Sequence, residues 1–252
     1  MGILLIIKNI YKKIHIDSFF YLYMIISCLS ANFKNFILFL SIIIIHELGH
    51  IFMGIIFKWK IDGIYLYPYG GVTRFNEDIN RCLYEELFIL LGGSFFQIIY
   101  LFLGYYFFNN YYFIYYNLSI LLFNLLPIYP LDGGRILNVF FSYFLSFRFS
   151  YYFVIIFSFF ICILFIIFSF IFNYKYNFIL MFLIVIFKIR EEYKKRHYYF
   201  NKFILERYIN NYGFKRIKTI SSIKKMMRDC RHIIFINNKY YTEKDYLKNL
   251  YR

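Results

Sequence analysis

The chain has 252 residues, of which 61% are hydrophobic and 26% aromatic, with only 3 prolines. Its hydrophobic residues come in long runs, which excludes an ordinary soluble domain and indicates a membrane protein. The formal net charge of +15 is uneven, because residues 188–252 carry +12 and the first 187 residues only +3. A basic segment after the last apolar run is typical of the positive-inside rule and of contact with an anionic lipid bilayer. No nucleic-acid recognition motif is visible, so we expect no nucleic-acid partner.

Six apolar segments approach the length of about 20 residues that a membrane-spanning helix needs. They are Ser18–Ala31, Phe36–Phe57, Leu83–Phe108, Tyr111–Ile128, Tyr151–Phe172 and Tyr176–Ile189. If the N-terminus is cytoplasmic, six crossings leave only Lys34 and Lys175 of the cationic residues on the opposite side. The sequence therefore predicts an all-α polytopic membrane protein with about six transmembrane helices and with both termini in the cytoplasm.

The second apolar segment contains the motif His46-Glu47-Leu48-Gly49-His50. On a helix, this H-E-x-x-H spacing places two imidazoles on one face, one turn apart, where they can share a zinc ion. Glu47 lies about 100° round the helix from His46, so it can face a water molecule without binding the metal. Ionisable groups at bilayer depth are costly and usually functional. The motif therefore predicts a Zn²⁺ site with Glu47 as a general base.

Between the second and third segments, residues 64–75 alternate in character and contain Gly70-Gly71. This stretch is too short to cross a bilayer. Irregular backbone at membrane depth is tolerated only when it packs against protein or lines a wet cavity. We therefore expect a short re-entrant β-hairpin loop.

A third metal ligand is predicted in the segment from Asn124 to Arg135, after the fourth apolar run. Pro127 and Pro130 break the helix, and the glycines that follow Asp132 let the backbone approach closely. We expect an unwound segment that presents the Asp132 carboxylate. Two histidines and one carboxylate leave the fourth position of tetrahedral zinc to water, as in catalytic sites.

The chain after residue 190 is polar and basic and forms a predicted region of its own. The predicted domains are a transmembrane domain of residues 1–190 and a small α/β cytoplasmic tail of residues 191–252. Within the tail we expect a short helix at Ser221–Asp229, a hairpin formed by His232–Ile236 and Lys239–Tyr241, and a helix at Glu243–Leu250.

Together these motifs resemble the site-2 protease family of intramembrane zinc metalloproteases. The resemblance rests on H-E-L-G-H in an early span and N-x-x-P-x-x-P-L-D-G-G in a later one. In addition, Pro68-Tyr-Gly-Gly-Val72 is similar to the P-F-G-G-V loop of the sporulation branch, the stage IV sporulation protein FB type. The resemblance implies that His46, His50 and Asp132 bind the zinc and that Glu47 is catalytic. It also implies substrate-binding roles for Asn124, Gly70, Gly71 and Pro130.

For function, the resemblance implies regulated proteolysis of a membrane-associated precursor, a sporulation pro-sigma factor, in the mother-cell membrane around the forespore. It further implies inhibitory membrane partner proteins that block the cleft.

The third span of the family often reads A-G-P-x-x-N, whereas this chain has Gln97 at the polar position, so the role of Gln97 is open. The tail resembles half a CBS domain. A complete nucleotide-binding module pairs two such halves, and this chain has only one. Whether the tail binds nucleotide and whether the protein forms a homo-oligomer therefore both stay open.

Two alternatives remain at this point. One is a general site-2 protease that acts on another membrane regulator. The other is a non-enzymatic metal-binding membrane protein or transporter. Transporters are often built from internal repeats with paired broken helices, and no such repeat is visible in the sequence.

Overall fold

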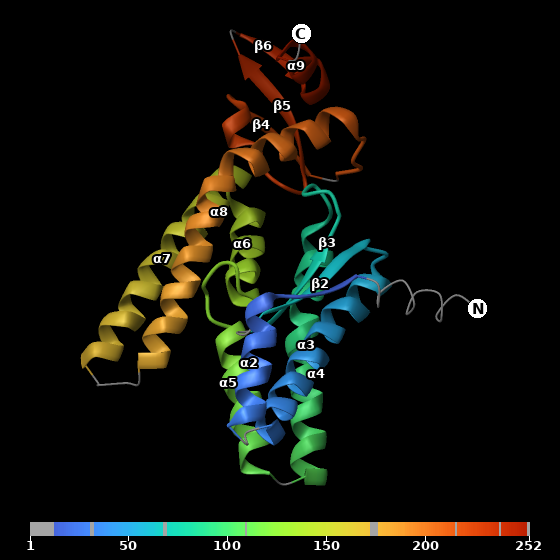
Figure 1. Cartoon of the computed structure of the whole chain (residues 1–252). Helices are drawn as coiled ribbons and strands as arrows, with labels where there is room; N and C mark the ends of the chain where they lie inside the picture. The colour runs from blue at the N-terminus through green and yellow to red at the C-terminus, as the bar shows by residue number, and fades with distance from the viewer. Residues whose placement is uncertain are drawn as a thin grey trace. The chain divides into compact units, whose positions relative to one another are not determined.

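A computed structural model describes residues 13–30, 33–67, 70–108, 110–171, 176–214, 216–236 and 238–250 (Figure 1). The chain divides into two compact units, one formed by residues 1–77 and 88–125 and the other by residues 78–87 and 126–252. Within the described ranges, three helices are long and apolar enough to cross a membrane: Phe33–Ile56, Leu83–Phe107 and Phe147–Ile171. The other three predicted spans are also helical over at least part of their length, but six crossings stay a prediction.

The first unit combines apolar helices with a small sheet. Its elements are β1 (Ile14–Ile16), α2 (Ser18–Leu29), α3 (Phe33–Ile56), β2 (Ile61–Tyr67), β3 (Gly70–Phe75), most of α4 (Leu83–Phe108) and α5 (Tyr111–Asn124).

Helix α3 ends in a Schellman-type turn. Lys58 adopts a left-handed conformation, with φ of 57°. Its N–H donates to the Ile55 carbonyl at 3.0 Å, and the Trp59 N–H donates to the Gly54 carbonyl at 2.8 Å. These two bonds satisfy carbonyls that the helix end leaves without partners. The turn stops the helix and directs the chain into β2.

The predicted hairpin is confirmed: β2 pairs antiparallel with β3, and Ile64 lies opposite Thr73. Figure 1 shows the hairpin beside α3, and β3 packs against that helix. Pro68 and Tyr69, the first residues of the glycine-rich loop motif, lie outside the described residues. Strand β1, which pairs in parallel with β2, was not predicted. At only three residues it is too short to give a recognisable alternation.

Helices α3 and α4 approach each other backbone to backbone at two glycines. A Cβ atom on Gly92 would lie 2.7 Å from the Gly49 carbonyl oxygen and 2.6 Å from Cγ of Met53. Small residues at such a crossing allow the close packing that holds membrane helices together. The crossing lies one residue from His50 on α3 and one residue from Gly93 on α4.

The second unit contains the remaining helices and the tail. Its elements are α6 (Asp132–Phe144), α7 (Phe147–Ile171), α8 (Tyr176–Ile209), β4 (Arg216–Ile220), the 3₁₀ turn η1 (Ile223–Lys225), β5 (Cys230–Ile236), β6 (Lys239–Thr242) and α9 (Glu243–Leu250). Helix α8 continues without a break through residue 190, where the sequence predicted a domain boundary. That boundary stays a prediction.

The segment around Asp132 corrects one expectation. Helix α5 ends at Asn124 and the chain stays non-helical to Leu131, but Asp132 is already the first residue of α6 rather than part of the unwound stretch. A carboxylate is favourable in the first turn of a helix because of the helix dipole. The space beside Gly134 is filled by the backbone of Ile128 and Tyr129. Gly134 therefore allows α6 to pack closely against the segment that precedes it.

The tail sheet has the order β4-β5-β6, with β4 and β5 parallel and β5 and β6 antiparallel. The predicted tail hairpin and the helix Glu243–Leu250 are confirmed. The helix predicted at Ser221–Asp229 is wrong, since only Ile223–Lys225 forms a 3₁₀ turn. Met226 and Met227 are instead buried, and Asp229 has a φ of 51°, which ends any helix there.

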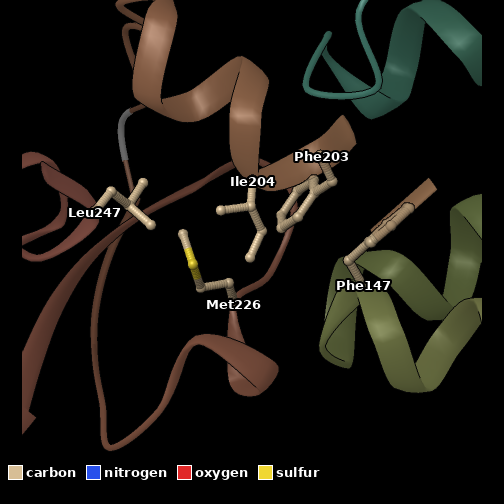
Figure 2. Close-up of a cluster of buried hydrophobic side chains, with 5 residues drawn as sticks. All are labelled: Phe147, Phe203, Ile204, Met226 and Leu247. Carbon is tan, nitrogen blue, oxygen red and sulfur yellow. The ribbon is translucent and has the colours of Figure 1, made fainter. Parts of the chain in front are cut away.

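An apolar cluster ties the tail to the ends of α7 and α8. Figure 2 shows its buried side chains converging from separate segments. They are Phe147, Phe203, Ile204, Met226 and Leu247. The rings of Phe147 and Phe203 stack with centroids 4.5 Å apart. Because these residues come from α7, α8, the segment after η1 and α9, their burial fixes the tail on these two helices.

Residues 78–87, which lead into α4, are held by the tail. The Asp229 carboxylate accepts a hydrogen bond from the Leu83 N–H at 3.0 Å, and so caps the first turn of α4. Arg228 forms an ion pair with Glu86 at 2.7 Å. Asn80 donates to the Glu206 carboxylate at 2.9 Å. The start of α4 therefore belongs to the second unit, while its later residues belong to the first.

Candidate metal centre

His46, Glu47 and His50 form a buried group on α3. Their side chains are 3%, 5% and 6% exposed, and one ligand atom from each lies within 4.8 Å of the others. Helical periodicity accounts for the pair of histidines, which are one turn apart. Three ionisable groups buried together need either a bound cation or strong polar partners.

The outer nitrogens of both imidazoles are held by α4. His46 Nδ1 lies 2.8 Å from Oε1 of Gln97, and His50 Nδ1 lies 2.8 Å from the carbonyl oxygen of Ile89. The Gln97 amide is oriented by its own donation from Nε2 to the Asn117 carbonyl at 2.9 Å. Both imidazoles therefore face acceptors at Nδ1, so the proton sits there and Nε2 keeps its lone pair.

The two Nε2 atoms of His46 and His50 lie 3.1 Å apart. With the protons on Nδ1, neither Nε2 can donate a hydrogen bond to the other. Two nitrogens that bind one tetrahedral zinc at about 2.0–2.1 Å lie roughly 3.3–3.4 Å apart. The spacing and the tautomers therefore fit a shared Zn²⁺, and the outer hydrogen bonds match those that usually orient metal-binding histidines.

Strand β3 contacts the Glu47 carboxylate. The Thr73 hydroxyl donates to Oε2 of Glu47 at 2.6 Å. A Cβ atom on Gly71 would lie 2.5 Å from Cγ and 2.7 Å from Cδ of Glu47. Sequence reasoning selected Gly71 but missed Thr73. The available signal was strand alternation, which puts residues 71 and 73 on the same face.

Two further residues approach the metal-facing nitrogens. A Cβ atom on Gly93 would lie 2.5 Å from Nε2 of His50 and 2.8 Å from Nε2 of His46. Nδ2 of Asn124, the last residue of α5, lies 3.4 Å from Nε2 of His46. Asn124 therefore lies beside the histidine pair, and its substrate-binding role stays a prediction. The absence of a side chain at Gly93 leaves the space in front of the histidines open.

The remaining candidate residues lie elsewhere in the chain. Asp132 and Pro130 belong to the second unit, where Asp132 begins α6 and Pro130 lies in the non-helical segment before it. The role of Asp132 as third ligand stays a prediction. Gly70 opens β3 with a φ of 152°, a conformation that other residues rarely adopt.

Substituting Gly93 with alanine should weaken zinc binding. The added methyl group would occupy the space directly in front of both Nε2 atoms. We expect zinc affinity to fall by about tenfold or more, the scale seen when groups around metal ligands are altered. Elemental analysis of the purified protein measures this. Gly213→Ala is the matched control, since nothing described lies within 4 Å of its added Cβ. Wild-type zinc content in Gly93→Ala would contradict the arrangement described above.

The chain is similar to known peptidases. The model of peptidase family M50 matches residues 34–111 and 105–168, together more than half of the chain. Stage IV sporulation protein FB of Bacillus subtilis is 32% identical over 246 residues, covering 89% of this chain and 84% of the relative. A zinc metalloprotease of Methanocaldococcus jannaschii is 31% identical over 156 residues, covering 54% of this chain and 44% of the relative. The chain thus spans less than half the length of this second relative.

A solved structure shares the fold. The site-2 protease from Methanocaldococcus jannaschii superposes with a TM-score of 0.56 and 26% sequence identity. The match covers 71% of this chain and 89% of that structure. The match to family M50 includes the H-E-L-G-H motif on α3 and the P-L-D-G-G motif at the start of α6.

Proposed function

We propose that this chain cleaves a membrane-associated pro-sigma factor during sporulation. The premise is that the chain belongs to peptidase family M50 and is an intramembrane zinc metalloprotease of the site-2 type. The observation that carries the catalytic part is the pair of Nε2 atoms 3.1 Å apart, each with its Nδ1 held by an acceptor. Support for the sporulation role comes from the identity to stage IV sporulation protein FB over most of both chains.

In this proposal the chain's own residues bind the metal, transfer the proton and hold the substrate. His46 and His50 offer neutral nitrogens and Asp132 completes the ligand set. Zinc, when bound, lowers the pKa of water and polarises a carbonyl. Glu47 accepts the proton of the attacking water and then gives it to the nitrogen of the departing amine. Asn124, beside His46, donates a hydrogen bond that holds the substrate backbone near the metal.

Substrate positioning in this proposal uses the glycine-rich hairpin and the segment before α6. Strand β3 is an edge of its sheet, since the order is β1-β2-β3. An extended substrate can add to such an edge through main-chain hydrogen bonds. Gly70 and Gly71 would keep that edge free of side chains, and Pro130 would also contact the substrate.

The membrane arrangement is part of the same proposal. Six crossings with both termini in the cytoplasm account for the charge asymmetry of the sequence. The protein would then lie in the mother-cell membrane around the forespore. Inhibitory membrane proteins would regulate it by blocking the cleft, and its tail, similar to half a CBS domain, leaves a homo-oligomer open.

Removal of zinc should abolish cleavage reversibly. The assay uses the detergent-solubilised full chain with two substrates, a membrane-associated sigma-factor precursor and an unrelated single-span membrane regulator. Treatment with a zinc chelator should stop the appearance of the shortened product, and added Zn²⁺, unlike Mg²⁺, should restore it, because two imidazoles select zinc over magnesium.

The two substrates separate the proposal from its alternative. Cleavage of the precursor alone supports the sporulation role, whereas equal cleavage of both substrates points to a general site-2 protease. Cleavage that persists in the metal-free protein would refute the zinc mechanism.

A further inference from the structure

Glu47 has a hydrogen-bond donor of its own that the metal motif does not contain. The Thr73 hydroxyl donates to Oε2 of Glu47 at 2.6 Å, and each of the two side chains is 5% exposed. A donation of this length to a carboxylate is a charge-assisted hydrogen bond, stronger than one between neutral groups. Within the described ranges no other hydrogen bond reaches the Glu47 carboxylate.

The strand fixes the position of this donor. Thr73 pairs with Ile64 of β2, so its backbone is held within the hairpin. As a β-branched residue, it has few χ1 rotamers available. Gly71, two residues earlier on the same face, leaves room for the stem of Glu47. One face of β3 therefore both makes space for the catalytic side chain and donates to it.

This arrangement leaves the two carboxylate oxygens unequal. Oε2 accepts from Thr73, whereas Oε1, which lies beside Gly71, accepts no hydrogen bond within the described residues. A glutamate side chain has three rotatable bonds, and a general base works only within hydrogen-bond reach of the proton that it removes. Restricting Glu47 to one rotamer places Oε1 ready for the water molecule, and so lowers the entropy lost in reaching the reactive geometry.

We propose that Thr73 is a positioning residue for the peptidase reaction, which holds Glu47 by its hydroxyl so that Oε1 receives the proton of water. This inference rests on the proposed function. In the reaction, the water oxygen bonds to the peptide carbonyl carbon while its proton moves to Oε1 of Glu47, and this proton then passes to the amine nitrogen as the peptide C–N bond breaks. Thr73 keeps its own proton throughout.

The test compares two substitutions at this residue. Thr73→Val keeps the shape and removes the donor, whereas Thr73→Ser keeps the donor. We expect Thr73→Val to lower kcat by about 10–100-fold, the range for loss of a hydrogen bond that orients an active-site group. KM and zinc content should stay unchanged, and Thr73→Ser should restore most of kcat. Wild-type kcat in Thr73→Val, or equal losses in both variants, would overturn the proposal.

A second measurement does not depend on cleavage. In a double-mutant cycle on the thermal unfolding of the full chain, Thr73→Val should lower the midpoint in the wild-type background but not in Glu47→Met, which has no acceptor. If the wild type is active and the midpoint shifts of the two substitutions simply add, the role of Thr73 is overturned. If the wild type cleaves no tested substrate, the proposed function is refuted instead. Midpoint shifts that do not add would in that case show that the contact exists without serving a peptidase.

Discussion

Replacing Glu47 with glutamine should abolish cleavage while zinc stays bound. General base catalysis contributes about 10²–10⁴-fold to rate, so we expect kcat to fall by that factor. Glutamine matches glutamate in shape, and its amide oxygen can still accept from the Thr73 hydroxyl, so β3 should keep its place. The amide cannot take up the proton of water. The measurements are product formation from the co-expressed substrate and zinc content of the purified variant.

The matched control for Glu47→Gln is Asp62→Asn. Asp62 is an exposed carboxylate on β2, in the same hairpin that contacts Glu47. Its neutralisation should leave both cleavage and zinc binding at the wild-type level. Unchanged cleavage in Glu47→Gln would refute the general-base role. Loss of zinc together with cleavage would mean that Glu47 binds the metal instead.

Replacing Arg207 with methionine should strongly lower the free energy of unfolding. The Arg207 side chain is 1% exposed and pairs with Glu243 at 2.8 Å. The guanidinium also donates to the carbonyl oxygens of Met227, at 2.6 Å, and Cys230, at 2.8 Å, and to Oδ1 of Asn80, at 2.6 Å. Removing one partner of a buried pair destabilises by about 3–5 kcal/mol, because the other charge stays buried. For a protein of this size, that corresponds to a fall of roughly 10 °C in the unfolding midpoint.

The stability that the Arg207–Glu243 pair contributes should decrease in acid. Burial alone would raise the pKa of Glu243, but hydrogen bonds from His232 and the nearby Arg207 outweigh burial and lower the pKa from 4.5. A lowered pKa in the folded state gives stability that is present above about pH 4.5 and is lost as the pH falls through the lowered value. The effect of Arg207→Met should therefore be largest near neutral pH and should shrink in acid.

Hydrogen exchange of β5 and α9, together with thermal unfolding, measures this destabilisation. Lys244→Met is the control, since Lys244 is an exposed cation on the same helix as Glu243. Adding Glu243→Leu to Arg207→Met should recover part of the stability, because the buried negative charge is then removed as well. A midpoint shift no larger than that of Lys244→Met would contradict the structural role of Arg207.

Contacts of the tail reach the first turn of α4. Arg207 donates to Asn80, and Asp229 caps α4 at Leu83. Helix α4 then continues to Ile89 and Gln97, the residues that accept from the two metal-binding histidines. The tail thus contacts the first turn of the helix whose later turns orient the imidazoles.

The sequence by itself determined the features that depend on neighbours along the chain. His46 and His50 share a face because a helix returns to the same side after four residues. The hairpin around Gly70-Gly71 and the tail hairpin followed from alternation and turn residues, and long apolar runs gave the helices. The family also followed from these short motifs, since a metalloprotease requires its ligands at fixed spacing.

Only the tertiary structure decided which distant groups hold the reactive ones. Gln97 and the Ile89 carbonyl set the imidazole tautomers from another helix, and Thr73 reaches Glu47 from a strand 26 residues away. Local propensity carries no information about such contacts, because they arise from the crossing of α3 and α4 at Gly49 and Gly92 and from the packing of β3 on α3.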